Sequence, residues 1–132
     1  MGIGPLLLDT HALVWAVTTP TRLGSEALKA IEDPANDVFV SAAAAWELAI
    51  KFQRGQLPEG EILVRAFDDI CARLRVRTLS ITTSHAISAG TLSWQHRDPF
   101  DRMLAAQSLQ EGMTLVSIDR AFRRVPSLRT LW

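Results

Sequence analysis

Four short strand-like runs, each followed by a helix-forming segment, constrain the fold of this chain most strongly. The first run, residues 6–8, is wholly apolar and stops at Asp9. Such a run suits a strand that is buried on both faces of a parallel sheet. Similar runs cover residues 38–40, 76–81 and 115–116. Strands that alternate with helices predict an α/β fold, in which helices cover both faces of a parallel sheet.

The helix after the second run carries the strongest local signals. Ser41 can cap its first turn, residues 42–54 are rich in alanine, and Gly55 stands at the usual C-terminal position. Similar reasoning predicts helices between Asp9 and Pro20, from a Ser25 cap to Glu32, over 61–74, from a Ser84 cap to Leu92, from Pro99 to Gly112, and briefly after Asp119, with an edge strand in 128–132.

Length and composition favour one globular domain over residues 1–132. Hydrophobic residues make up 48% of the chain and charged residues 21%, which allows a sizeable core. The leucines before Asp9 are too few for a signal sequence or a membrane span. Cys71 is the only cysteine, so no intrachain disulfide can form. We therefore expect a cytoplasmic protein that does not enter the membrane.

The formal net charge is zero, so overall charge does not indicate a polyanion as partner. Twelve of the 14 basic residues are arginine, whose planar guanidinium suits two-point contacts to phosphate. Arg120, Arg123 and Arg124 lie close together in the sequence. They fit a phosphate-facing patch or a solvated helix face equally well.

Acidic residues follow the predicted strands. Asp9 comes after the first run, Asp119 after the fourth, Glu47 lies about two turns into the helix after the second, and Asp101 lies in the first turn after Pro99. Asp98 is a fifth candidate. Ligands of open parallel sheets gather outside the carboxyl ends of the strands, so we expect these carboxylates to share one pocket.

Each acidic residue also has a purely structural interpretation. Aspartate is a favoured cap wherever a helix begins, which could account for the four aspartates one at a time. Glu47 could form an exposed surface pair with Lys51, four residues later. The apolar neighbours of Glu47 argue instead that its side chain is at least partly enclosed and needs a partner.

A shared carboxylate pocket predicts a bound cation, because repulsion would otherwise raise the pKa values of its members. Carboxylate oxygens without histidine or thiolate favour Mg²⁺ or Mn²⁺ over zinc. Such a cation can polarise a phosphoryl oxygen and activate water. The pocket thus indicates phosphodiester chemistry.

Three segments resemble the acidic motifs of VapC-type PIN domains, in order along nearly the whole chain. They are LLLDTHALVW, SAAAAWELAIKFQRGQL and HRDPFDRMLAAQSLQEGMTLVSID, followed by Phe122. The resemblance implies a three-layer α/β/α sandwich around a five-stranded sheet and an endoribonuclease toxin that leaves a 5′-phosphate and a 3′-hydroxyl. It also implies a cognate VapB-type antitoxin and a homodimer.

The resemblance places the metal-binding carboxylates at Asp9, Glu47, Asp101 and Asp119, with Asp98 as an accessory ligand. Supporting roles fall to Thr10, Ser117, Lys51 and Arg102: the two hydroxyls orient carboxylates or water, Lys51 pairs with Glu47 or faces a phosphate, and Arg102 lies at the pocket rim. Ser117 departs from the threonine that the family often has there, although the hydroxyl is kept. His11 and His96 are expected to be structural or surface histidines. Trp15, Trp46 and Trp94 fit either core packing or stacking on unpaired bases.

Rival classes fit the residues less well. A haloacid-dehalogenase-type phosphatase needs an aspartate where His11 stands, and a receiver domain needs a further acidic pair near the first strand. A PIN domain without activity, which only binds protein or RNA, would be favoured if a motif carboxylate were replaced. All four motif positions are acidic.

Overall fold

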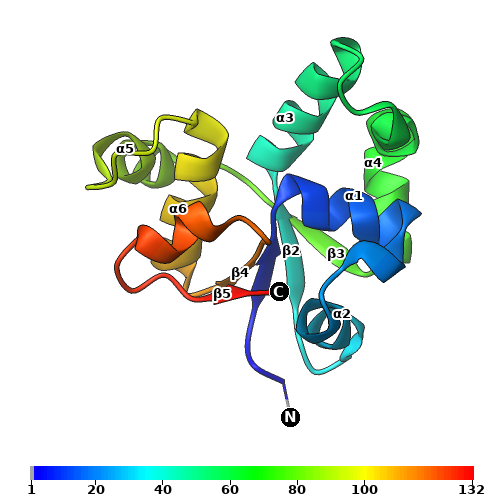
Figure 1. The fold of residues 1–132 in the computed structure, drawn as a ribbon, viewed down its shortest axis with the longest axis horizontal. Coiled ribbons are helices and arrows are strands. Elements are labelled where there is room, and N and C mark those ends of the chain that lie inside the picture. Colours follow the sequence, from blue (N-terminus) through cyan, green and yellow to red (C-terminus); the bar gives the residue numbers. More distant parts are fainter. Residues whose placement is uncertain (1) are drawn as a thin grey trace.

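A five-stranded sheet forms the centre of the fold, which the computed structural model describes for residues 2–132 (Figure 1). Its strands lie in the order β3-β2-β1-β4-β5, and all neighbouring pairs are parallel. The strands are β1 (Leu6–Leu8), β2 (Val38–Ser41), β3 (Val76–Leu79), β4 (Thr114–Val116) and β5 (Thr130–Leu131). The predicted parallel sheet with a C-terminal edge strand is confirmed.

Helices cover the two faces of the sheet and make the three predicted layers (Figure 1). One side carries α1, α2 and α4, and the other carries α5, α6 and a short 3₁₀ helix, η3. The α-helices are α1 (Thr10–Thr18), α2 (Ser25–Glu32), α3 (Ala42–Gln53), α4 (Glu61–Arg73), α5 (Thr83–Thr91) and α6 (Pro99–Glu111), and the 3₁₀ helices are η1 (Pro20–Arg22), η2 (Pro58–Gly60) and η3 (Arg120–Arg124). In the described part of the chain, no helix has the length and apolarity needed to cross a bilayer.

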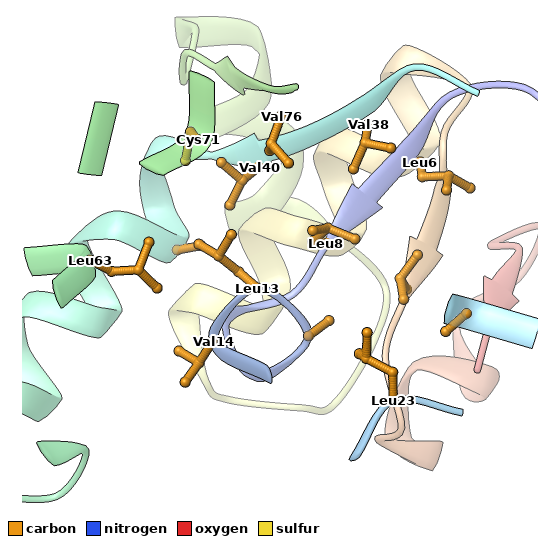
Figure 2. Close-up of a cluster of buried hydrophobic side chains, with 14 of the residues drawn as sticks. Leu6, Leu8, Leu13, Val14, Leu23, Val38, Val40, Leu63, Cys71 and Val76 are labelled. Carbon is orange, nitrogen blue, oxygen red and sulfur yellow. The ribbon is translucent and has the colours of Figure 1, made fainter. Parts of the chain in front are cut away.

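The central strand supplies both hydrophobic cores because its side chains alternate between the faces of the sheet. Leu6 and Leu8 point into the larger core, where they meet residues of α1, α2 and α4 (Figure 2). Leu7 points to the opposite face and packs with Leu104 of α6 and Phe122 of η3. All three leucines are fully buried, as the unbroken apolar run predicts for a strand covered on both faces.

Capping residues set where the helices begin. Ser41 and Asp98 accept backbone hydrogen bonds at the starts of α3 and α6, as predicted. The prediction for α5 is wrong: Thr82, and not Ser84, is its cap. Thr82 and His85 form a reciprocal pair of side-chain to backbone hydrogen bonds, which explains the earlier start of this helix and the end of β3 at Leu79.

The predicted helix over 61–74 is confirmed with one irregularity. At Ala66 the backbone leaves helical geometry, with φ −142° and ψ 44°, so α4 is kinked. The C-termini of α3 and α6 are followed by glycines at positive φ, Gly55 at 71° and Gly112 at 66°. Glycine adopts this conformation without steric cost, so both helices end as the sequence predicts.

Replacing Leu8 by alanine should lower the free energy of unfolding by about 2–5 kcal/mol, because it leaves a cavity in the larger core. Denaturant unfolding followed by circular dichroism measures this change. Ile87→Ala is the matched control, since the Ile87 side chain on α5 is 62% exposed and its loss should cost about 0.5 kcal/mol or less. Equal losses in both variants would contradict the proposed core.

Candidate active site

The central strands β1 and β4 deliver two carboxylates to the same edge of the sheet. Asp9 follows β1, and its backbone N–H donates to the carbonyl of Val116 at the end of β4. Its Oδ1 also accepts from the N–H of Ala12, 2.8 Å away, and caps α1. Asp119 follows β4 and caps η3 by accepting from Ala121 at 2.9 Å. The capping interpretation therefore holds for both residues without removing them from the site.

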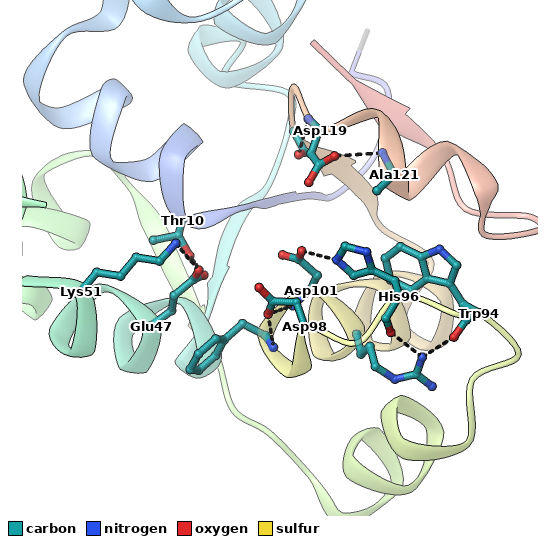
Figure 3. A network of polar contacts seen from close by, with 12 residues as sticks. Thr10, Glu47, Lys51, Trp94, His96, Asp98, Asp101, Asp119 and Ala121 are labelled. Carbon is teal, nitrogen blue, oxygen red and sulfur yellow. Dashed lines mark hydrogen bonds and ion pairs between the residues drawn. The ribbon is translucent and has the colours of Figure 1, made fainter. Parts of the chain in front are cut away.

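Glu47 of α3 is enclosed and has two partners, as its apolar neighbours predict. The residue is 5% exposed. Its Oε1 accepts a hydrogen bond from the Thr10 hydroxyl at 2.6 Å, and its Oε2 lies 2.7 Å from Nζ of Lys51 (Figure 3). The interpretation as an exposed surface pair is wrong, because the glutamate side chain is only 7% exposed. Both oxygens of this enclosed carboxylate therefore have a protein partner.

The first turn of α6 contributes two further aspartates. Asp98 Oδ1 accepts from the backbone N–H of Phe100 at 2.9 Å and of Asp101 at 3.2 Å, so Asp98 caps the helix. Asp101 Oδ2 lies 2.7 Å from Nε2 of His96, in the loop before the helix (Figure 3). The helix N-terminus favours negative charge at both aspartates.

All five acidic candidates line one small cavity of about 210 Å³. Thr10, Lys51 and His11 also line it, together with the apolar side chains of Leu104, Ile118 and Phe122. Figure 3 shows Glu47 on one side of this region, Asp101 and Asp98 in the middle, and Asp119 across from them. The structure thus brings together the carboxylates that the strand ends predicted.

Crowding and burial disfavour the ionised form of two of these carboxylates. Burial raises the pKa of Asp101 to about 6, with smaller contributions from Asp98 and Glu47, although the hydrogen bond from His96 opposes the rise. Burial also raises the pKa of Asp9, against the lowering effects of the Ser117 hydroxyl and the Ala12 amide. Partly dehydrated carboxylates that face one another in this way need a compensating cation.

The donor set fits a hard divalent cation, since the cavity offers carboxylate and hydroxyl oxygens. Within residues 2–132, however, no three histidine, cysteine or acidic side chains lie close enough to one another to hold a metal as they stand. Each carboxylate has a protein partner instead: Lys51 for Glu47, His96 for Asp101, and backbone N–H groups for Asp9, Asp98 and Asp119. Binding a cation therefore requires side-chain rotation within the cavity.

Arg102 does not lie at the rim of the cavity, and this sequence prediction is wrong. Its guanidinium donates to the backbone carbonyls of Ala89, Leu92, Trp94 and His96 at 2.6–3.0 Å. These carbonyls belong to the end of α5 and the loop that follows it, where no regular ladder satisfies them. Arg102 thus fixes the α5–α6 loop.

The structure gives the surroundings of two further aromatic residues. His96, which the sequence predicts to be a structural or surface histidine, contacts Asp101 directly. Its only sequence signal was its place in the polar loop five residues before Asp101. Trp46 is 62% exposed and packs edge-on against Phe100, with ring centroids 5.1 Å apart, so it is not a core residue.

A three-layer sandwich with acidic residues at the carboxyl ends of adjacent parallel strands defines a class of α/β proteins with a polar site at the sheet edge. The family model of the PIN domain matches residues 6–128. Ribonuclease VapC22 of Mycobacterium tuberculosis is 33% identical over 130 residues, which cover 96% of this chain and 98% of that protein. The chain therefore belongs to the PIN-domain family.

Solved structures support the fold independently of sequence. VapBC2 from Rickettsia felis, bound to a DNA fragment from its promoter, superposes with a TM-score of 0.71 at 18% identity, over 96% of this chain and 97% of that one. VapBC-1 from nontypeable Haemophilus influenzae gives a TM-score of 0.64 at 19% identity, over 96% of each chain. At these identities the agreement establishes a shared fold, and the predicted PIN-like sandwich is confirmed.

The raised pKa of Asp101 predicts that, in the metal-free protein, this carboxyl contributes stability that is lost as the pH rises from about 4 to about 6. In this window the folded state keeps a proton that the unfolded state, with an aspartate pKa of 3.8, has released. Asp101→Asn should remove this contribution, so the stability of the wild type relative to the variant should fall as the pH rises from 4 to 6. The raised pKa of Asp9 contributes to the pH dependence of stability in the same direction. Chemical denaturation at several pH values in EDTA measures the slope.

Asp69→Asn provides the control for this titration, because Asp69 is exposed on α4. Its pH profile should follow the wild type. A stability difference between the wild type and Asp101→Asn that stays constant from pH 4 to 6 would rule out a raised pKa of the Asp101 carboxyl.

Proposed function

We propose that this protein is a metal-dependent endoribonuclease, the toxin of a VapBC-type toxin–antitoxin pair acting in the cytoplasm. The observation that carries the proposal is the cavity at the carboxyl ends of β1 and β4, which five carboxylates line. The 33% identity to Ribonuclease VapC22 over nearly the full length of both chains supports RNA as the substrate. All of residues 1–132 would form the one catalytic domain.

Asp9, Glu47, Asp101 and Asp119 would hold Mg²⁺ or Mn²⁺, with Asp98 as an accessory ligand. A cation held there would supply Lewis-acid polarisation of a phosphoryl oxygen and would activate water for hydrolysis of the phosphodiester bond. Hard oxygen donors and the absence of thiolate from the cavity favour these ions over zinc.

Neighbouring side chains keep the carboxylates in place for this role. The Thr10 hydroxyl and the Lys51 ammonium fix the two oxygens of Glu47, so this carboxylate is held in one orientation at the cavity. The Ser117 hydroxyl accepts from the Asp119 backbone N–H at 3.0 Å, which fixes the turn after β4. Arg102 acts at a distance, by fixing the loop that carries His96.

An antitoxin is the natural inhibitor of such a cavity. An anionic site that is not fully neutralised attracts a cationic side chain, and a guanidinium can contact two carboxylates at once. We therefore propose a VapB-type partner whose C-terminal segment brings an arginine or lysine close to Asp9, Glu47 and Asp101, and a homodimer of this chain within the complex. VapBC assemblies among the solved structures with this fold support the partner class.

Removal of divalent metal should abolish RNA cleavage, because the carboxylates alone cannot activate water. Purified protein should cut a fluorescently labelled single-stranded RNA in Mg²⁺ or Mn²⁺, stop in excess EDTA, and recover when the metal is restored. A gel assay resolves the fragments. Undiminished cleavage in EDTA would contradict a metal-dependent mechanism.

Asp9→Asn and Asp101→Asn should each lower the cleavage rate by at least about 100-fold, since loss of a ligand should cost no less than loss of an outer-sphere partner. Asparagine keeps the cap that Asp9 forms, so thermal unfolding should show both variants folded. Asp69→Asn, at an exposed position outside the cavity, serves as the control. A variant with the wild-type rate would assign that aspartate to capping alone.

A further inference from the structure

A second and larger cavity lies next to the carboxylate cavity. Its volume is about 780 Å³, which is within the range of sites that bind small molecules. The α5–α6 loop provides one wall, with Trp94 and His96, and η3 provides the other, with Arg120 and Arg124. These are the tryptophan and the arginines whose roles the sequence left open.

Two direct contacts join the two cavities. His96 lines the larger cavity and bonds to Asp101, which lines the carboxylate cavity. Ala121 lines the larger cavity, and its N–H donates to Asp119 on the other side. A molecule in the larger cavity would thus be separated from the proposed cleavage site only by residues that bond directly to one another across the two cavities.

Aromatic surface forms one wall of the larger cavity. The rings of Trp94 and His96 stack with centroids 4.4 Å apart and planes 15° from parallel (Figure 3). Trp94 also packs against Phe122, at 5.7 Å between centroids. The two Nη atoms of Arg102 bind the backbone carbonyls of Leu92, Trp94 and His96, so the stack is fixed before any ligand arrives. Base stacking on such a surface tolerates any base sequence.

Positive charge forms the opposite wall. Arg120 and Arg124 are exposed, and within residues 2–132 neither forms an ion pair with a carboxylate. They lie beside a cavity lined by five carboxylates, which repels phosphates until a cation is bound. Two free guanidiniums at its edge supply the local attraction that a chain of zero net charge otherwise lacks.

We propose that the larger cavity binds the nucleotide of single-stranded RNA adjacent to the cleaved bond, with its base on the Trp94–His96 stack and its phosphate on Arg120 and Arg124. This inference rests on the proposed ribonuclease function and identifies where that enzyme holds its substrate. Single-stranded RNA is the form required, because duplex RNA does not expose its base faces.

Binding of a labelled single-stranded RNA is measured by fluorescence anisotropy in Ca²⁺, a divalent cation that offsets the charge of the neighbouring carboxylates but is not the proposed cofactor, and a gel of the same samples checks that the RNA stays intact. The Arg120→Ala/Arg124→Ala double variant should bind about tenfold more weakly or worse. The slope of log affinity against log salt concentration should fall by roughly 0.7, since the contact to one phosphate is lost. Arg123→Ala is the matched control: Arg123 lies on the same η3 but does not line the cavity, and its loss should leave affinity nearly unchanged.

Trp94 is tested by a pair of variants that separate stacking from packing. Trp94→Leu keeps an apolar side chain against Phe122 but removes the aromatic face, and it should weaken binding at least about fivefold. Trp94→Phe should stay within about threefold of the wild type. Thermal unfolding of both variants checks that the loop remains folded. A duplex of the same sequence should bind more weakly than the single strand to the wild type.

Several results would overturn this site. They are no RNA binding by the wild type, equal losses from Arg123→Ala and the double variant, unchanged binding by Trp94→Leu, or duplex binding as tight as that of the single strand. Each can occur while the wild type cleaves RNA in Mg²⁺, which leaves the proposed function intact. Conversely, binding that depends on Trp94, Arg120 and Arg124 without any cleavage in Mg²⁺ or Mn²⁺ supports the site and refutes the ribonuclease activity.

Discussion

Burial of acidic side chains around one cavity of about 210 Å³ is the constraint to which the rest of the site responds. Burial raises the pKa values of Asp9 and Asp101, which measures how poorly the protein alone solvates these charges. Lys51 offsets the charge of Glu47, and backbone N–H groups at helix starts offset those of the aspartates. A divalent cation would therefore stabilise this site more than a site in which protein groups already offset all of the carboxylate charge.

The same residues serve as helix caps and as site carboxylates, and the topology explains why. A helix that follows a parallel strand begins at the carboxyl edge of the sheet, so its cap is placed there as well. Asp9 and Asp119 each use one oxygen, Oδ1, for a backbone N–H, and both residues still line the cavity. Structural and functional interpretations of these aspartates are therefore compatible. Replacement by asparagine separates the two roles, because it keeps an oxygen that can cap the helix and removes the negative charge that would bind a cation.

Local signals predicted the features that depend on neighbouring residues in the chain. The apolar run of β1, the Ser41 cap and the glycine after α3 gave the element order, and the acidic positions after the strands gave the cavity. Contacts between distant segments carried no such signal. Nothing near Arg102 indicates that its guanidinium bonds to carbonyls as far away as Ala89, 13 residues earlier. The exposure of Trp46 likewise depends on which face of α3 the remaining helices leave uncovered.

Arg102 shows how a residue outside both cavities can control both. Its guanidinium satisfies four carbonyls at the end of α5 and in the loop that follows it, and a buried carbonyl without a partner would be costly. That loop carries Trp94, which lines the larger cavity, and His96, which also contacts Asp101 of the smaller one. Lysine could not replace this arginine, because one ammonium lacks the planar fork that reaches several carbonyls at once. The relative position of the aromatic stack and the carboxylates thus depends on a single cation that touches neither a carboxylate nor either cavity.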